Sequence, residues 1–304
     1  MQAFGYFLLY PFIFIFSRLP LRVLYYLSDY LLYPVLYRML GYRTKVVRLN
    51  INNALPEYSD AQKLKIEKDF YHYLCDLFVE TIKSFSTSPE FLAKHVKYKN
   101  VELLDKFYAN NKSVLLTLGH IGNYEWIAKS ISLELKHLFL VPYHEMSNPS
   151  FDSLFKKSRS AFGGVFFPTY ETIKVLRREF ERPILLGLAN DQSAPPNKAY
   201  WTRFLNQDTS FFVGTEKMAI QFGYPVVFGH VSVKKRGEYT LTLMEITEDP
   251  ALMPEGEIMK QHAKMLERNI LEYPKYWLWS HRRWKHEMPE GIPYGFNIVK
   301  KSRA

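Results

Sequence analysis

Residues 113–125, SVLLTLGHIGNYE, decide the fold class of this 304-residue chain. The apolar run Ser113–Leu118 is typical of a strand buried on both faces, and Ile121–Leu135 has the length and pattern of a helix. A buried strand that passes directly into a helix is the basic unit of an α/β sheet. The residues at this junction are therefore expected at the carboxyl end of a strand, where α/β sheets place their active sites.

Helical and strand-like segments alternate along most of the remaining chain, without a long linker or an internal repeat. Ser59 and Gln62 form a capping-box pattern that opens a long amphipathic helix, which ends before Ser88 and Pro89. We therefore predict a single α/β domain with a mixed central sheet flanked by helices. The other expected helices cover 101–108, 151–162, 171–180, 217–222 and 255–271, and the other expected strands cover 138–141, 164–167, 183–189, 225–233 and 239–246.

Composition limits the class of protein. Hydrophobic residues make up 47% of the chain and aromatic residues 16%, which excludes a disordered protein. A net charge of +10 suits either a nucleic acid or an acidic membrane surface. No nucleic-acid-binding motif accompanies the basic residues, so we expect a membrane and no nucleic acid. Cys75 is the single cysteine, which excludes an internal disulfide.

The first 40 residues are expected to form a membrane-associated segment, followed by a catalytic domain over 41–304. Residues 3–16 are apolar but shorter than the roughly 20 residues that span a bilayer upright. Residues 23–40 mix leucine and tyrosine with charges, which favours interfacial or re-entrant helices. Basic residues follow the apolar run and place the main body in the cytoplasm if the run crosses the membrane. Whether it crosses stays open, and an ordinary buried helix is the alternative.

His120 and Glu125 are the candidate catalytic pair. A neutral imidazole can take the proton of a hydroxyl group while the oxygen attacks a thioester, and a carboxylate can hold the imidazole in the required tautomer. Glu125 can contact the far ring nitrogen if the first helical turn is irregular. Judged by spacing alone, a helix-capping histidine beside a solvated glutamate fits equally well. No histidine has metal-ligand spacing, so no metal is expected.

Several further motifs occur in a characteristic order: Arg159 before Phe162-Gly163-Gly164, Asp191-Gln192, Phe212 with Gly214 and Thr215, and Tyr273-Pro274, Trp277, Trp279 and His281–Trp284. With the His120–Glu125 spacing, H-x4-D/E, this order resembles the lysophospholipid acyltransferase superfamily and, within it, the lauroyl and myristoyl acyltransferases of lipid A biosynthesis. The resemblance covers nearly the whole chain, and the lack of a Glu-Gly-Thr motif favours the lipid A branch. Phe204-Leu205-Asn206 departs from the Phe-Phe-Gly turn of many members, which leaves acceptor contacts there in doubt.

The resemblance implies that His120 is the general base, Glu125 its partner and Arg159 a third catalytic residue. Without the resemblance, Arg159 is one basic residue on a solvated helix face, Asp191 and Gln192 form a strand-to-loop turn, and the C-terminal run is ordinary packing. The substrate-binding residues that the family pattern and the expected sheet edge suggest are Asn123, Asp191, Gln192, Arg282 and Arg283.

The resemblance also implies the partners and the location. The donor is an acyl carrier protein thioester or, as the second choice, a coenzyme A thioester, with no cofactor, and the acceptor is a glycolipid such as a lipid A precursor. The catalytic domain is expected on the cytoplasmic side of the bacterial inner membrane. Two alternatives stay open: another acceptor, such as an amino-acid lipid or a different glycolipid, and a non-catalytic protein that binds anionic membranes. Acyl-chain length and the acceptor hydroxyl are also open.

Overall fold

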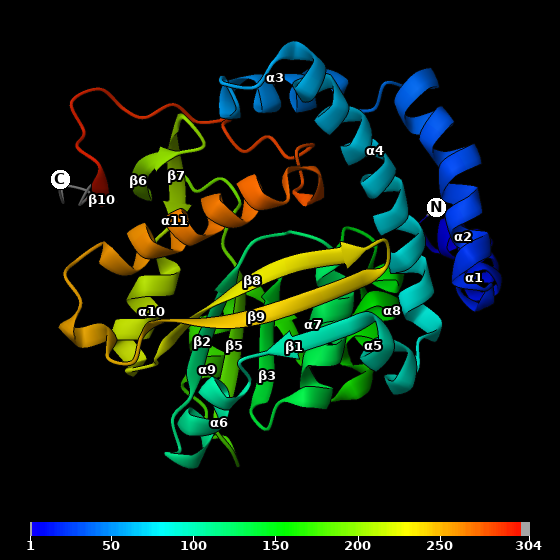
Figure 1. Ribbon diagram of the computed structural model, residues 1–304. Coiled ribbons are helices and arrows are strands. Elements are labelled where there is room, and N and C mark those ends of the chain that lie inside the picture. Colours follow the sequence, from blue (N-terminus) through cyan, green and yellow to red (C-terminus); the bar gives the residue numbers. More distant parts are fainter. Residues whose placement is uncertain (1, 299–304) are drawn as a thin grey trace.

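The computed structural model describes residues 2–298, with side chains over 10–295, and has a seven-stranded mixed sheet at its centre (Figure 1). The strand order is β1-β9-β8-β2-β5-β3-β4. All neighbouring strands are parallel except β8 and β9, which form an antiparallel hairpin. The single domain with a mixed sheet is therefore confirmed. The bounds are β1 Val96–Lys99, β2 Val114–Leu118, β3 Leu138–Tyr143, β4 Val165–Pro168, β5 Ile184–Ala189, β8 Val226–Lys235 and β9 Glu238–Thr247.

Strand β2 lies in the middle of the sheet, parallel to both of its neighbours, β8 and β5. Its residues Val114, Leu115 and Leu116 are at most 1% exposed, as expected for a strand with both faces covered. The predicted strand Ser113–Leu118 is thus confirmed. Because β5 and β8 run in the same direction as β2, their carboxyl ends meet at one edge of the sheet, beside the residues that follow Leu118.

Helices surround the sheet, and α4 is the longest of them (Figure 1). The capping box of Ser59 and Gln62 is present at the start of α4, so this prediction is confirmed. Helix α11 packs against β8, β9 and β2, while α7 packs against β1 and β3. The bounds are α3 Thr44–Ala54, α4 Asp60–Lys83, α5 Pro89–His95, α6 Glu102–Ala109, α7 Tyr124–Glu134, α8 Pro149–Arg159, α9 Thr172–Leu176, α10 Gly214–Phe222 and α11 Glu257–Glu272.

The N-terminal helices, residues 2–39, lie along the outer side of α4 (Figure 1). They comprise α1 (Gln2–Arg18), α2 (Leu21–Leu27) and the π-helical turns η1 (Ser28–Leu32) and η2 (Pro34–Met39). Within the described part of the chain, no helix combines the length and the apolar character needed to cross a membrane. The membrane role of this segment and the boundary at residue 40 stay predictions. Exposed apolar side chains gather here: Tyr10, Phe12, Phe14, Ile15, Val23, Tyr26, Tyr30, Leu31, Met39 and Leu40.

A second sheet, with three antiparallel strands, was not predicted. It consists of β6 (Lys198–Phe204), β7 (Gln207–Phe212) and β10 (Gly295–Ile298), with β6 in the centre. Leu205 and Asn206 connect β6 to β7 with φ values of 48° and 59°. A two-residue hairpin turn requires this left-handed conformation and usually shows it by a glycine. Leucine at its first position hides the turn from sequence inspection.

Two glycines allow the chain to leave β2. A Cβ atom on Gly119 would collide with the side chain of Leu266 and lie 3.3 Å from Oδ2 of Asp191. Gly122 has a φ of +60°, and a Cβ atom there would lie 2.9 Å from Cδ1 of Tyr239. The loop over residues 119–123, called the histidine loop below, can therefore pass close to its neighbours only because these two positions lack side chains.

Replacing Gly122 by Ala is expected to lower the free energy of unfolding by more than the roughly 1–2 kcal/mol that left-handed backbone costs an L-residue. The added methyl group also meets Tyr239. Gly223→Ala is the matched control, because Gly223 has a φ of +65° but no atom within 4 Å of the new Cβ. Urea denaturation of both variants measures the difference. An equal loss of unfolding free energy in the two variants would show that the contact with Tyr239 adds nothing to the cost.

Candidate active site

The carboxylate of Asp191 holds the imidazole of His120. His120 follows β2 and Asp191 follows β5, and these strands are parallel neighbours. Oδ1 of Asp191 lies 2.5 Å from Nδ1 of His120, and Oδ2 accepts hydrogen bonds from the backbone N–H of His120 at 2.7 Å and from Nε1 of Trp277 at 3.0 Å. The side chain of Asp191 is 3% exposed and that of His120 is 19% exposed. This pairing uses Nδ1 and leaves Nε2 for a ligand.

His120 and Asp191 shift each other's pKa in opposite directions. Burial lowers the pKa of His120, but the charge and hydrogen bond of Asp191, together with the charge of Glu125, raise it above its ordinary value. Burial raises the pKa of Asp191, but the charge of His120 and the N–H donors of His120 and Trp277 hold it well below its usual range. Asp191 is therefore ionised at neutral pH, and in the neutral form of His120 it favours the tautomer with the proton on Nδ1.

Glu125 pairs with Arg159, which corrects the expected contact between Glu125 and His120. Nε of Arg159 donates to Oε2 of Glu125 at 2.8 Å, and Nη2 donates to Oε1 at 2.6 Å. Helix α7 begins only at Tyr124, so Glu125 lies in its first turn and faces α8, where Arg159 is the last residue. Asp191, which the sequence had suggested as a substrate-binding residue, takes the place beside the imidazole. The ion pair still acts on His120 through the charge of Glu125.

Three contacts, from α4 and from the C-terminal residues Tyr276 and Trp277, anchor the histidine loop. The hydroxyl of Tyr73, on α4, donates to the carbonyl oxygen of Gly122 at 2.8 Å. The N–H of Gly122 donates to the carbonyl oxygen of Tyr276 at 3.0 Å, and Ile121 forms an antiparallel bridge with Trp277. The C-terminal aromatic run thus supports the histidine loop by backbone pairing. Tight anchoring of this kind restricts the motion of a catalytic group.

Three of the predicted substrate-binding residues differ in exposure from one another. Asn123 is fully buried: its Oδ1 accepts from the N–H of Trp126, and its Nδ2 donates to Glu80. Both polar groups of Asn123 are thus engaged within the protein, so it caps α7 and does not face a substrate. Gln192 is half-buried and Arg282 is exposed.

Arg283 lies in the core and not at the surface where a substrate contact was expected. It is 1% exposed, and its guanidinium carbon lies 4.6 Å from the ring centroid of Phe211. Among the described residues its three guanidinium nitrogens have no hydrogen-bond partner. Burial lowers the pKa of Arg283 to about 9, against the raising effect of the Asp191 charge.

Sequence inspection missed two buried residues near the site. Lys129 lies one helical turn after Glu125 on α7 and donates to the carbonyl oxygen of Ser84. Burial lowers its pKa to about 8, against the charge of Glu125. His262, on α11, is fully buried between Thr117 and the backbone of Asn190, and burial lowers its pKa to about 4. His262 is therefore neutral and structural. For Lys129, the sequence signal was its spacing of four residues from Glu125, which places the two side chains on the same helix face.

A polar pocket of about 560 Å³ adjoins the histidine loop without including His120. Tyr73 and Tyr276, which hold Gly122, form part of its wall. Oppositely charged side chains from the N-terminal helices, α4 and the β8–β9 turn face it. Within the described residues, no group of three or more His, Cys, Asp and Glu side chains is placed to hold a metal ion. The charged lining consists of Asp29, Asp69, His72, Asp76, Lys234, Lys235, Arg236 and Lys275.

The fold and the site define a class of protein: an α/β protein with a histidine, oriented by a buried carboxylate, at the carboxyl edge of its central strand. A family model described as bacterial lipid A biosynthesis acyltransferase matches residues 1–286, and the chain belongs to that family. This confirms the resemblance, and it identifies the protein as an enzyme of the acyltransferase type. No curated protein matches the chain.

Replacing Asp191 by Asn is expected to lower the pKa of His120 below its ordinary value. Burial then acts on the imidazolium ion without the opposing charge of Asp191. Titration of the His120 ring signals by nuclear magnetic resonance measures this shift. Glu125→Gln is the comparison variant, and a smaller fall is expected because the charge of Glu125 contributes least. An unchanged pKa in Asp191→Asn would contradict the assigned pairing.

Proposed function

We propose that the protein transfers a fatty acyl chain from a thioester donor to a hydroxyl group of a glycolipid at a membrane surface. The donor is acyl carrier protein or coenzyme A, and the acceptor is a lipid A precursor, on the cytoplasmic side of the bacterial inner membrane. The His120–Asp191 pair carries this proposal, because a buried carboxylate bound to Nδ1 leaves Nε2 as a base for an alcohol. The family match supports the acyl-transfer chemistry.

The proposed reaction needs no covalent acyl-enzyme intermediate. Nε2 of His120 takes the proton of the acceptor hydroxyl as its oxygen attacks the thioester carbonyl carbon. The resulting oxyanion collapses, the carbon–sulfur bond breaks, and the departing thiolate takes the proton from the imidazolium ion. The products are the ester and a free thiol. Asp191 stabilises the imidazolium ion between these steps.

Arg159 and Glu125 supply the second part of the proposed site. Two nitrogens of Arg159 bind Glu125, which leaves Nη1 to approach the thioester oxygen or a phosphate group. Glu125 therefore acts on the reaction by holding Arg159. In the proposed complex the polar pocket beside Tyr73 and Tyr276 takes the acceptor headgroup, because its carboxylates, lysines and tyrosine rings suit a polyhydroxylated ligand.

The N-terminal helices are proposed to lie on the membrane. Their exposed apolar side chains are concentrated in one segment, and Arg18, Arg22, Arg38 and Arg43 accompany them. Apolar contact combined with basic residues is how interfacial helices bind anionic lipid surfaces. A lipid acceptor embedded in the same surface would then be near the site.

Replacing His120 or Asp191 by Ala is expected to lower the rate of acyl transfer by about 10²–10⁴-fold, the usual contribution of a positioned general base. Purified protein, acyl carrier protein thioester and lipid A precursor form the assay, and coenzyme A thioester is tested in parallel. Glu248→Gln is the control, because Glu248 pairs with Lys106 and Lys112 away from the site. Full activity of His120→Ala would overturn the proposed chemistry.

Deletion of the gene is expected to remove one acyl chain from lipid A, because the proposed acceptor is a lipid A precursor. Mass spectrometry of extracted lipids detects the loss, and re-expression of the unchanged protein restores the chain. Re-expression of His120→Ala should not restore it. Intact lipid A in the deletion strain, with a change in another lipid class, would redirect the proposal to a different acceptor.

Replacing Phe12, Ile15 and Leu31 together by Ser is expected to weaken binding to phosphatidylglycerol vesicles by at least about tenfold, because each side chain loses apolar contact with lipid. Vesicle co-sedimentation measures the affinity. Leu252→Ser is the control, since Leu252 is 81% exposed but lies outside the N-terminal helices. Equal weakening in the control, or none in the triple variant, would argue against this membrane contact.

A further inference from the structure

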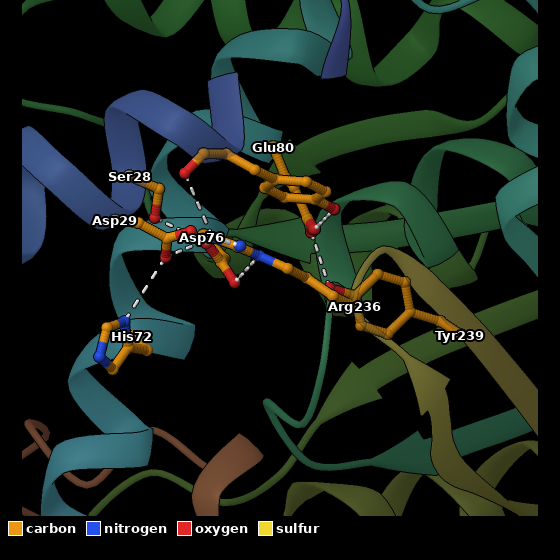
Figure 2. A network of polar contacts seen from close by, with 8 residues as sticks. Ser28, Asp29, His72, Asp76, Glu80, Arg236 and Tyr239 are labelled. Carbon is orange, nitrogen blue, oxygen red and sulfur yellow. Dashed lines mark hydrogen bonds and ion pairs between the residues drawn. The ribbon is translucent and has the colours of Figure 1, made fainter. Parts of the chain in front are cut away.

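Glu80 is a fully buried carboxylate that accepts hydrogen bonds from three elements other than its own helix. It lies on α4 and is 0% exposed. Oε1 accepts a hydrogen bond from the hydroxyl of Tyr25, on α2, at 2.5 Å. Oε2 accepts from the hydroxyl of Tyr239, on β9, at 2.7 Å (Figure 2). It also accepts from Nδ2 of Asn123, in the histidine loop, at 2.6 Å. These hydrogen bonds join the N-terminal helices, α4, β9 and the start of α7.

The donors around Glu80 are neutral, which makes its burial unusual. A buried charge normally has an ion partner, and on the same helix Asp76 has one in Arg236 (Figure 2). Burial raises the pKa of Glu80 to about 7, although the hydroxyl groups of Tyr25 and Tyr239 and the amide of Asn123 lower it. A glutamine would fill the same volume without this desolvation. A carboxylate, however, can accept from all three donors and donates to none.

Asn123 has no freedom to change its role in this arrangement. Its Oδ1 accepts from the N–H of Trp126 at 2.8 Å and thereby caps α7, so its Nδ2 must find an acceptor elsewhere. Glu80 provides that acceptor, and the carbonyl oxygen of Glu80 also accepts from Nε1 of Trp126 at 2.9 Å. Glu80 therefore holds the N-cap residue of α7, Asn123, which lies three residues after His120 and two before Glu125.

The same carboxylate receives the N-terminal helices. Besides the Tyr25 hydroxyl, Arg236 in the β8–β9 turn binds Asp29 and Asp76, and Ser28 donates to Asp76 at 2.6 Å (Figure 2). Asp76 and Glu80 are one helical turn apart on α4. The seating of α2 on α4 is thus connected to the histidine loop through the hydrogen bonds of Tyr25 and Asn123 to Glu80, and the neighbouring ion pairs of Arg236 hold η1 beside them.

We propose that Glu80 is a positioning residue for acyl transfer, which holds the start of α7 so that His120 and the Glu125–Arg159 pair face the same substrate, and which makes the N-terminal helices part of that assembly. This inference rests on the proposed general-base role of His120. Glu80 does not touch the reacting atoms. It acts through Asn123, and a small displacement of a catalytic group is enough to slow a reaction strongly.

Glu80→Gln is expected to lower kcat by about 10–100-fold and to leave KM for the thioester donor nearly unchanged. An amide has one acceptor oxygen where the carboxylate has two, so either Tyr25 or the Tyr239–Asn123 pair loses its acceptor in this variant. Assays are run above neutral pH, where Glu80 is ionised in the unchanged enzyme. The ring signals of His120 in nuclear magnetic resonance spectra are expected to shift as well, and this readout does not depend on activity.

The matched control is Glu67→Gln. Glu67 is also on α4 and is 3% exposed, and it accepts hydrogen bonds from Tyr37 and Arg48 but none from the histidine loop. Its replacement is expected to lower the melting temperature while kcat is retained. A loss of kcat in Glu67→Gln as large as that in Glu80→Gln would reduce Glu80 to a general stabilising residue and overturn the inference.

A second variant reverses the direction of the hydrogen bond. Asn123→Asp alone brings two carboxylates together and is expected to lose more activity than Glu80→Gln. Combined with Glu80→Gln, the aspartate at position 123 still caps α7 and accepts from the new amide, so kcat is expected to recover in part. Absence of recovery, with both proteins folded, would contradict the inference. Tyr25→Phe tests the link to α2 and is expected to give a smaller fall in kcat.

The two proposals fail in different ways. If His120→Ala keeps its activity, the general-base mechanism is wrong, whatever Glu80 does. If His120→Ala is inactive while Glu80→Gln has the kcat and the His120 ring signals of the unchanged enzyme, the mechanism stands and the positioning role of Glu80 is wrong.

Discussion

The carboxylate of Asp191 is the contact on which the site depends. It is nearly inaccessible to solvent and accepts three N–H donors, two from His120 and one from Trp277. Removing an ionised carboxylate from water is costly unless charge and hydrogen bonds compensate. Three segments must therefore meet at this carboxylate: the end of β5, the histidine loop and the C-terminal run that contains Trp277. Gly119 is part of the same constraint, because a side chain there would displace Leu266 and crowd the carboxylate.

Three carboxylates near the histidine loop have different partners, and the partners decide their roles. Asp191 faces an imidazole and stays ionised. Glu125 forms a bidentate ion pair with Arg159. Glu80 meets neutral donors only, so burial brings its pKa to about 7. Residue type is nearly the same in all three cases, and the surroundings make one an orienting group, one a clamp for a guanidinium group and one a structural acceptor.

Regular elements with a clear period were predictable. The buried strand β2 and the long helix α4 carry their signals in consecutive residues, as apolar runs, helical spacing and a capping box. The hairpin of β6 and β7 escaped prediction because Leu205 occupies a left-handed position that usually shows a glycine. The short strand β1 also escaped, since four residues contain too little pattern to distinguish a strand from a loop.

Local sequence was enough to place His120 after a buried strand, to mark Glu125 as its companion and to suggest the family, and the family resemblance added Arg159. It did not pair them correctly. His120 and Asp191 are 71 residues apart, and they meet because β2 and β5 are adjacent in the sheet. The packing of α7 against its neighbours brings Glu125 to Arg159 and Asn123 to Glu80. Arg283, in the C-terminal run, lies in the core. These contacts arise from the packing of distant elements, and no local pattern encodes them.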